Sequence, residues 1–461
     1  VSADVTKFGT YKIIPTVRVS ADGTQSYRCG AFPFSVVNKR TDGEPLNYES
    51  GANSLAYYIE TQDKWDAVKE IMKQAGIGGI RTVLSWSDVQ KTKDAFVNNA
   101  SYANIAYSDA ISSGINNMAT LSMENAVLYG GWDKPNAPHK IGTEEAWAEW
   151  EAYVDYVSKT YKDSVTYWEV INEPNAFMTG AQYAEYITRA YPIIKKNDPD
   201  GLVCGFALSG REWTWLESAL KAVSADCMDI ITIHPYDWEF DQNEFAGLEQ
   251  WSTVFRDNNY VNSMNRLKTL LAKYGFENIP VLSTEVSVSS TPPSVEHKGL
   301  SSLKAQGAEL IQLYALTKKE GFINSSYWYS LICTSVRGLE DAVDGDRNGN
   351  FGLVGNEKDV VPYAAKPAYA AMAGYNKMLT NAEYVDCIEN VNDWSGTRAY
   401  RFRRTDGKQV IVLWSENKAE NIALNLGIDN AEIYDKYTNK IGVMKADGGV
   451  FNFTSSFEPI Y

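Results

Sequence analysis

Residues 167–175 have the sequence YWEVINEPN, in which an apolar strand ends at a proline. Proline has no backbone N–H to donate to a neighbouring strand, so Pro174 stops the strand and places Glu173 at its C-terminal end. In barrels of parallel strands, the side chains that carry chemistry gather at that end. The segment therefore predicts a functional carboxylate at a strand end, with a helix-capping or loop carboxylate as the alternative.

The chain on both sides of this segment alternates short apolar runs with longer amphipathic stretches, from about residue 30 to residue 379. This alternation is typical of repeated βα units with a parallel sheet. Eight units can be counted, with strands expected at residues 31–37, 80–85, 118–123, 165–172, 202–208, 230–236, 279–286 and 326–331.

Helices are expected between these strands. In residues 63–75, Trp65, Val68 and Met72 recur at helical spacing, which predicts a stripe that faces the core. Eight such units favour an α/β fold that closes into a (β/α)8 barrel. A doubly wound open sheet is the alternative, but it usually carries a glycine-rich phosphate turn, and the sequence contains neither G-x-G-x-x-G nor a P-loop. Further helices are expected at residues 144–159, 181–196, 213–223, 262–273, 305–319 and 366–378.

The pattern changes at about residue 380 to short alternating runs with turn signals. Residues 400–404 and 410–414, joined by TDGK at 405–408, predict a β-hairpin. With runs at 421–426, 432–437 and 450–454, they predict an antiparallel β-sandwich over residues 380–461, after a barrel over residues 30–379. Residues 1–29 hold another hairpin, 11–19 with 26–29, which we expect to add strands to the sandwich. No flexible linker separates the two parts, so a firm interface is expected.

Composition and charge exclude several classes of protein. The 461 residues are 44% hydrophobic and 22% charged, which is ordinary globular usage. The formal net charge of −15 at pH 7 repels nucleic acid and anionic membrane surfaces, and no apolar run approaches the roughly 20 residues of a membrane span. Because the chain begins at Val1 and not at methionine, we expect a processed protein that is secreted or periplasmic.

No metal or cofactor is expected. The three histidines, His139, His234 and His297, are far apart and lack metal-ligand spacing. Residues 344–349 match the first half of a calcium loop, but Gly355 stands where the bidentate glutamate belongs. The cysteines are scattered singly, which indicates neither a metal site nor a disulfide framework: Cys29, Cys204, Cys227, Cys333 and Cys387.

A second carboxylate interrupts an apolar run in residues 280–287, PVLSTEVS. An ionised carboxylate loses its hydration when buried, so Glu285 needs a functional reason or an ion-pair partner. Three βα units separate Glu173 from Glu285, which places them across the barrel mouth from each other. Two facing carboxylates are what glycoside hydrolysis requires. Like charge and partial burial are expected to raise the pKa of one glutamate, while hydrogen bonds keep the other ionised.

The ordered motifs resemble those of the clan A retaining glycoside hydrolases. The motifs are Asn172-Glu173-Pro174, His234-Pro235-Tyr236 and Thr284-Glu285, and the resemblance spans about residues 30–379. Similarity to the branch of families 39 and 5 comes from IRT (80–82), WSD (86–88), YWY (327–329), NFGLV (350–354), KPAY (366–369) and the terminal EPIY (458–461).

The resemblance implies roles for individual residues. Glu173 is expected to be the acid/base and Glu285 the nucleophile, with Asn172 on the sugar 2-hydroxyl. His234 and Tyr236, two apart on one strand, should share a face, and Tyr236 should contact the nucleophile. The resemblance also implies Arg81 beneath the nucleophile, with a structural ion pair as the alternative, and Trp328 as the floor under the sugar, with core packing as the alternative. For His234 the alternative is a satisfied core histidine. By their positions after the third and sixth strands, Trp132 and Trp238 are weaker subsite candidates, with loop packing as the alternative, and Asn125 at the end of the third strand is expected to point toward the mouth.

The expected activity is hydrolysis of β-linked sugars by double displacement, without metal or cofactor. A transglycosylase with the same site and a catalytically silent carbohydrate-binding barrel are the alternatives. A metal-dependent barrel hydrolase would need a ligand cluster that the sequence lacks. The sugar stays open among xyloside, glucan, mannan and galactan. Long loops expected at residues 38–58, 237–249 and 287–300 slightly favour exo action.

Overall fold

The structure is a computed structural model. It describes residues 5–18, 26–28, 32–41, 43–93, 95–129, 143–236, 257–290, 300–336, 348–388, 396–415 and 419–461. Among these residues, no helix has both the length and the apolar character needed to cross a bilayer.

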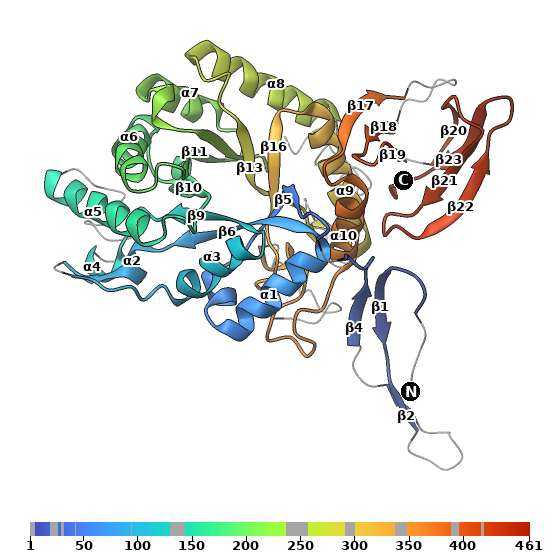
Figure 1. The fold of residues 1–461 in the computed structure, drawn as a ribbon, viewed down its shortest axis with the longest axis horizontal. Helices are drawn as coiled ribbons and strands as arrows, with labels where there is room; N and C mark the ends of the chain where they lie inside the picture. Colours follow the sequence, from blue (N-terminus) through green and yellow to red (C-terminus); the bar gives the residue numbers. More distant parts are fainter. Residues whose placement is uncertain are drawn as a thin grey trace.

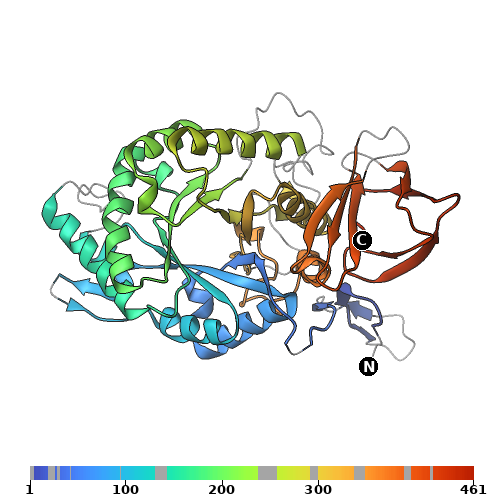
Figure 2. The ribbon, with the colours of Figure 1, turned by 45° about the horizontal axis from the view of Figure 1, so that its top comes forward.

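Eight parallel strands close into a barrel, as the βα alternation predicts. The last strand pairs with the first, which completes the cylinder, and Figures 1 and 2 show the helices packed around it. In barrel sequence the strands are β5 (Asn47–Asn53), β6 (Ile77–Leu84), β9 (Asn116–Leu121), β10 (Tyr167–Val170), β11 (Leu202–Ser209), β12 (Ile230–His234), β13 (Val281–Val286) and β16 (Ile323–Trp328).

The helices expected from the sequence are confirmed. Helix α1 (Gln62–Ala75) begins where the Thr61 side chain accepts a hydrogen bond from the Lys64 amide, and it ends at Gly76, whose φ of 70° suits glycine. The others are α5 (Glu144–Thr160), α6 (Gly180–Asn197), α7 (Trp213–Ala222), α8 (Asp257–Tyr274), α9 (Leu303–Glu320) and α10 (Pro367–Leu379). Helix α3 (Ser101–Ser112) was not expected, because its buried face consists largely of alanine and tyrosine, which give little hydrophobic contrast.

The first barrel strand is not the one expected from the sequence. Residues 31–37 contain β4 (Phe32–Val36), which lies outside the barrel and pairs antiparallel with β1 (Gly9–Ile13). The barrel begins instead with β5, NYESGAN, a segment expected to be a loop that walls the site. The sequence did not indicate a strand here because the segment is mostly polar. Gly51 is required there because a Cβ would lie 2.3 Å from the ring of Tyr327 inside the barrel.

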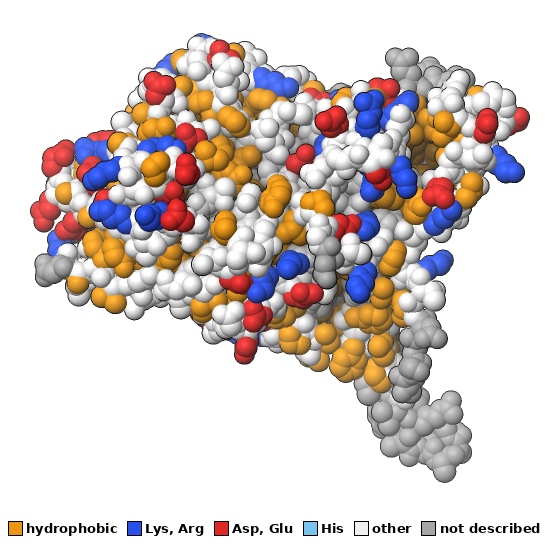
Figure 3. Space-filling model, viewed as in Figure 1, with side chains coloured by type: hydrophobic (Ala, Val, Ile, Leu, Met, Phe, Trp, Pro, Cys, Tyr) orange, Lys and Arg blue, Asp and Glu red, His pale blue; other side chains and the backbone are white. Residues whose placement is uncertain are grey.

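The N-terminal hairpin is present, but its described residues do not pair with the C-terminal sheets. Strands β2 (Thr16–Arg18) and β3 (Ser26–Arg28) pair as expected, whereas β1 and β4 pair only with each other in the described part of the chain. Two hydrogen bonds join the Phe8 backbone to the Asn439 side chain at 2.6 and 2.9 Å. Figure 3 shows hydrophobic side chains over this region, where Ile13 and Phe32 are exposed.

The C-terminal residues form antiparallel sheets. Strands β17 (Glu383–Cys387), β18 (Thr397–Arg403) and β19 (Gln409–Ser415) form one sheet, and the β18–β19 hairpin confirms the turn expected at 405–408. Strand β20 (Glu420–Asn425) pairs with β23 (Val450–Ser455), and β21 (Asn430–Tyr434) pairs with β22 (Lys440–Lys445). Strands β17 and β22 were not expected.

The sheet of β17, β18 and β19 packs against helices α9 and α10 (Figure 2). Phe402 of β18 is fully buried in the same apolar cluster as the barrel helices. Arg404 donates to the Lys377 carbonyl at 3.2 Å, and Gln312 donates to the Phe457 carbonyl at 2.9 Å. The described parts of the barrel and the C-terminal sheets therefore share apolar and polar contacts.

We predict that deleting residues 380–461 gives insoluble or unstable protein. The deletion would expose the apolar faces of α9 and α10 that now pack against the sheets. Soluble yield and thermal unfolding followed by circular dichroism measure the effect. A soluble truncation that melts like the full chain would show that the C-terminal sheets are an independent module.

Candidate active site

The barrel interior has an apolar layer with a polar layer nearer the C-terminal strand ends. Side chains from five strands form the apolar layer: Met118, Cys204, Ile230, Leu282 and Tyr327. Side chains in a strand alternate between its two faces, so Trp328, which follows Tyr327, packs in the larger core beneath the helices, as does Trp168 of β10. Residues further along the inward faces carry the polar groups described next.

Arg81 of β6 is the centre of the polar layer. Its guanidinium is buried and donates through Nε to Glu169 Oε2 at 2.8 Å, and through Nη1 to Glu285 Oε1 at 2.7 Å. It also donates to Asn53 Oδ1 at 2.8 Å and to Asn172 Oδ1 at 2.7 Å. Burial opposes the charged form, but the two carboxylates outweigh it and raise the pKa of Arg81. Arg81 thus lies beneath Glu285, as expected.

Glu169 is a buried carboxylate that the sequence prediction missed. Its Oε2 accepts from Arg81 and from Thr120 Oγ1, and its Oε1 accepts from Thr284 Oγ1 at 2.7 Å. Burial alone would raise the pKa of Glu169, but the charge of Arg81 outweighs burial and lowers it. A sequence signal existed, because Glu169 interrupts an apolar strand as Glu285 does.

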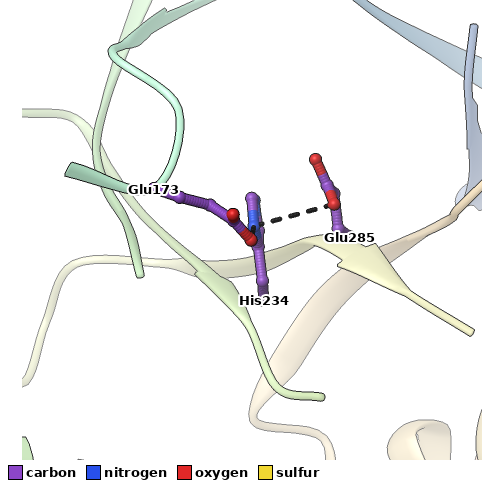
Figure 4. Close-up of side chains that lie close together, drawn as sticks. All are labelled: Glu173, His234 and Glu285. Atoms are coloured by element: carbon purple, nitrogen blue, oxygen red, sulfur yellow. Dashed lines mark hydrogen bonds and ion pairs between the residues drawn. The ribbon is translucent and has the colours of Figure 1, made fainter. Parts of the chain in front are cut away.

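Glu173 follows β10 and points across the mouth. Its backbone has φ of 47° and ψ of 50°, and a short 3-10 turn begins at Pro174. Its Oε1 lies 2.9 Å from Nδ1 of His234, which stands between the two glutamates (Figure 4). Burial acts to raise the pKa of Glu173, but hydrogen bonding and charge from His234 outweigh it and lower the pKa. The expected upward shift is therefore wrong for Glu173 in this structure.

Glu285 of β13 is held by two neighbours. Its Oε1 accepts from Arg81 at 2.7 Å, and its Oε2 accepts from the Tyr236 hydroxyl at 3.3 Å. One atom from each of Glu173, His234 and Glu285 can be chosen so that all three lie within 4.8 Å of one another. The two carboxylates thus face each other across a gap that one sugar carbon and its leaving oxygen can bridge.

His234 and Asn172 contact the same network. His234 is fully buried, and its Nε2 lies 3.1 Å from Thr284 Oγ1 while its Nδ1 faces Glu173. The Oδ1 atom of Asn172 is bonded to Arg81. The amide donor Nδ2 is therefore the part of Asn172 that can bind a substrate hydroxyl.

Trp328 does not line the mouth. Its ring is fully buried in the core beneath the helices, and its Nε1 donates to the Phe351 carbonyl at 3.0 Å. Strand alternation turns the next residue, Tyr329, back toward the site. Tyr329 is half-buried, and burial together with the nearby Glu285 carboxylate raises its pKa. Tyr329, which directly follows β16, and not Trp328, is therefore the aromatic residue at this strand end that lies near Glu285.

Asn125 is structural. It is fully buried, donates to the Gln90 carbonyl at 2.7 Å, and accepts from the amides of Val127 and Leu128 at 3.1 Å. Its amide therefore orders the loop after β9, and the expected substrate contact is wrong. Trp132, Trp238, His139, His297 and residues 344–347 lie outside the described residues.

Across the described ranges, one group of side chains is close enough to hold a metal ion: Glu173, His234 and Glu285. Their atoms already have protein partners. Nδ1 of His234 contacts Glu173, and both oxygens of Glu285 accept hydrogen bonds. All three side chains are thus already engaged in the hydrogen-bond network of the site.

A separate cavity of about 380 Å³ lies at the opposite end of the barrel. It is lined by the start of β16 and by side chains that include Glu49, Lys318 and Tyr384. Lys318 is paired with Glu49 at 2.5 Å. The cavity holds none of the site residues described above.

Comparisons with known proteins concern the family and the fold of the chain. The sequence profile of the cellulase family, glycosyl hydrolase family 5, matches residues 40–328. No curated protein matches the chain. Among solved structures, a family 39 glycoside hydrolase from the gut symbiont Bacteroides cellulosilyticus WH2 has a TM-score of 0.76 at 21% identity, covering 99% of this chain and 88% of that one.

Two further structures are more distant. A GH30 endoxylanase from Clostridium papyrosolvens C71 has a TM-score of 0.59 at 12% sequence identity. A monomeric β-xylosidase from Caulobacter crescentus CB15 has a TM-score of 0.59 at 16% sequence identity. Each match covers 90% of this chain and 96% of the other. At these identities the likeness establishes the fold.

Proposed function

The chain belongs to glycosyl hydrolase family 5, the cellulase family, and we propose that it hydrolyses β-glycosidic bonds with Glu285 as nucleophile and Glu173 as acid/base. Membership confirms the resemblance to clan A glycoside hydrolases. The proposed reaction rests on one observation: one carboxylate oxygen of Glu173 and one of Glu285 lie within 4.8 Å of each other across the mouth.

This spacing supports a mechanism that retains anomeric configuration. Retaining enzymes hold their carboxyl groups about 5 to 5.5 Å apart, whereas inverting enzymes leave roughly 6.5 to 9.5 Å for a water molecule between carboxylate and sugar. One oxygen of each glutamate lies within 4.8 Å of the other, which is closer to the separation in retaining enzymes than to that in inverting enzymes. Direct attack by a glutamate on the anomeric carbon fits the gap.

In the first step, Glu285 attacks the anomeric carbon as the bond to the leaving oxygen breaks. Arg81 and the Tyr236 hydroxyl donate hydrogen bonds to Glu285 and hold its carboxylate in place for the attack. Glu173 gives its proton to the leaving oxygen, and the sugar becomes an ester of Glu285. The Nδ2 group of Asn172 donates to a ring hydroxyl, a contact that strengthens in the transition state.

In the second step, water replaces the leaving group. Glu173, now ionised, takes one proton from this water, and the oxygen attacks the anomeric carbon while the bond to Glu285 breaks. A sugar acceptor in place of water would give transglycosylation by the same steps, so the acceptor decides between hydrolase and transglycosylase.

The substrate class is a β-linked carbohydrate. Similar folds include an endoxylanase, a β-xylosidase and a bifunctional glucanase-xylanase, which supports testing xylosides and glucans first. Purified protein should release product from at least one of a panel of aryl β-glycosides, xylan, β-glucan, mannan and galactan. The variant that combines Glu173→Ala and Glu285→Ala is the blank. A chain that binds one of these polysaccharides but cleaves none would be a carbohydrate-binding barrel.

We predict that catalysis is independent of metal ions. The proposed nucleophile and acid/base act through protons and hydrogen bonds that the protein itself supplies. Activity after exhaustive chelation and dialysis should equal that of the untreated enzyme. Loss of activity that a divalent ion restores would contradict the prediction.

A further inference from the structure

The hydroxyl of Thr284 has only one hydrogen to donate. That hydrogen goes to Oε1 of Glu169, at 2.7 Å. Glu169 can only accept, because Arg81 lies against it and keeps its pKa below the usual value. The direction of the Thr284 hydroxyl is therefore set by a carboxylate that is fully buried.

The direction of this hydroxyl fixes the hydrogen on the next group. Nε2 of His234 lies 3.1 Å from Thr284 Oγ1, whose hydrogen is already used. Nε2 must therefore be the donor in this contact. In a neutral imidazole the second nitrogen is then an acceptor, so Nδ1 carries no hydrogen of its own.

Nδ1 faces Oε1 of Glu173 at 2.9 Å, which is a hydrogen-bond distance. Such a contact needs one hydrogen between the two atoms. It lies either on Glu173, beside a neutral ring, or on Nδ1, beside an ionised carboxylate. Both arrangements contain the same single proton.

We propose that Thr284 and Glu169 are positioning residues which fix the ring hydrogen of His234 on Nε2, so that His234 and Glu173 share one proton. The proposal deepens the acid/base role proposed for Glu173 and rests on it. In catalysis the proton moves from the pair to the leaving oxygen. Water returns it in the second step, so the pair ends with the proton with which it began.

The charges around the pair favour keeping this proton. Without this proton, the described network would hold three negative carboxylates, those of Glu169, Glu173 and Glu285, and one positive guanidinium, that of Arg81. The Nδ1 lone pair of His234 would also face an ionised Glu173 with no hydrogen between them. Among the residues that the structure describes, the titratable and charged groups that face the pair are Arg81, Glu169, Tyr236, Glu285 and Tyr329.

Thr284→Val tests the proposal through the pH profile. Without the hydroxyl, the neutral ring can place its hydrogen on Nδ1 and donate to ionised Glu173, so the acid loses its proton at lower pH. The basic limb of kcat/KM, measured with a substrate whose leaving group needs protonation, should move down by about one pH unit. Thr284→Ser retains the hydroxyl and should restore the wild-type limb.

Thr120→Val is the matched control. It also removes a hydroxyl that donates to Glu169, at 2.8 Å, but it does not touch His234. Its basic limb should stay in place. Equal shifts in Thr120→Val and Thr284→Val would mean that the effect runs through the charge of Glu169 alone, and would overturn the proposal.

Nitrogen-15 NMR of the histidines provides a readout that does not depend on activity. The chain has three histidines, so variants His139→Gln and His297→Gln identify the His234 signals. Wild-type His234 should carry hydrogen on Nε2, either alone or on both nitrogens, and never as the neutral Nδ1–H form. Thr284→Val should show that form.

A neutral Nδ1–H ring in the wild type would overturn the proposal, even if Thr284→Val failed to fold. The expected ring form in a protein without glycosidase activity would instead contradict the proposed function, and would leave the hydrogen-bond assignment standing. The two failures are therefore distinguishable.

Discussion

Replacing Glu285 with alanine should lower turnover by roughly 10⁵-fold, the order of loss seen when a covalent nucleophile is removed. Azide added to this variant should enter the vacated space beside Arg81 and attack the anomeric carbon directly. The product should be the glycosyl azide of inverted configuration, because only one displacement occurs. Rate recovery with azide and product configuration by NMR are the two measurements.

Glu173→Ala should behave differently. Glu285 still attacks substrates with good leaving groups, which need little protonation, whereas substrates with poor leaving groups should lose about 10²- to 10⁴-fold in rate. Deglycosylation then slows because no base activates water. Azide attacks the accumulated intermediate, so the azide product should retain configuration after two displacements.

The pair of outcomes assigns the roles. If Glu285→Ala gave the retained azide and Glu173→Ala the inverted azide, the nucleophile would be Glu173 and the acid/base Glu285. Turnover like that of the wild type in both variants would contradict the glycosidase mechanism proposed for these residues. Glu145→Ala is the control, because Glu145 is an exposed carboxylate on α5. It should turn over substrate like the wild type.

Arg81→Met should destabilise the protein by about 3 to 5 kcal/mol, because it leaves Glu169 and Glu285 without their buried cation. The pKa of Glu169 is lower in the folded protein than the ordinary glutamate value. Its ion pair with Arg81 therefore stabilises the fold at pH values above the ordinary pKa of glutamate. This stabilisation is lost as the pH falls through the pKa of Glu169 in the folded protein. The stability difference between wild type and variant should therefore be large at pH 7 and smaller near pH 4. Denaturant unfolding at the two pH values measures it.

Arg81→Lys is the matched variant. It retains the charge but loses the planar fork that reaches Glu169, Glu285, Asn53 and Asn172 together. Its stability at pH 7 should lie between those of wild type and Arg81→Met. Equal stability of Arg81→Met and wild type at pH 7 would show that the network contributes nothing to folding.

The sequence alone determined the barrel class and the two glutamates. Both residues are charges at the ends of apolar strands, and the desolvation that such a charge would suffer is a local property of the strand. The βα alternation then placed them on the same edge of the sheet. His234, Tyr236 and Arg81 followed from the resemblance, and the structure brings all three into contact with the glutamates.

Contacts between distant strands could not be predicted in this way. Strand β5 is polar, so its place beside β6 and β16 follows only from barrel closure. Which way an aromatic ring faces depends on strand register, and this turned Trp328 outward and Tyr329 inward. Nothing in the sequence indicated that the Asn125 side chain has hydrogen-bond partners. In the structure it donates to the Gln90 carbonyl and accepts from the Val127 amide.

The pattern of apolar runs thus determined the kind of fold and placed the two glutamates at strand ends. Both follow from the sequence because hydrophobic periodicity and the desolvation of a charge within an apolar run are local properties of the chain. Tertiary structure decided which atoms meet. Thr284 and Glu169 lie 115 residues apart, yet the hydroxyl of one contacts the carboxylate of the other and so reaches the ring beside Glu173. Hydrogen bonds depend on distance and direction between atoms, and only the folded barrel fixes those for residues from different strands.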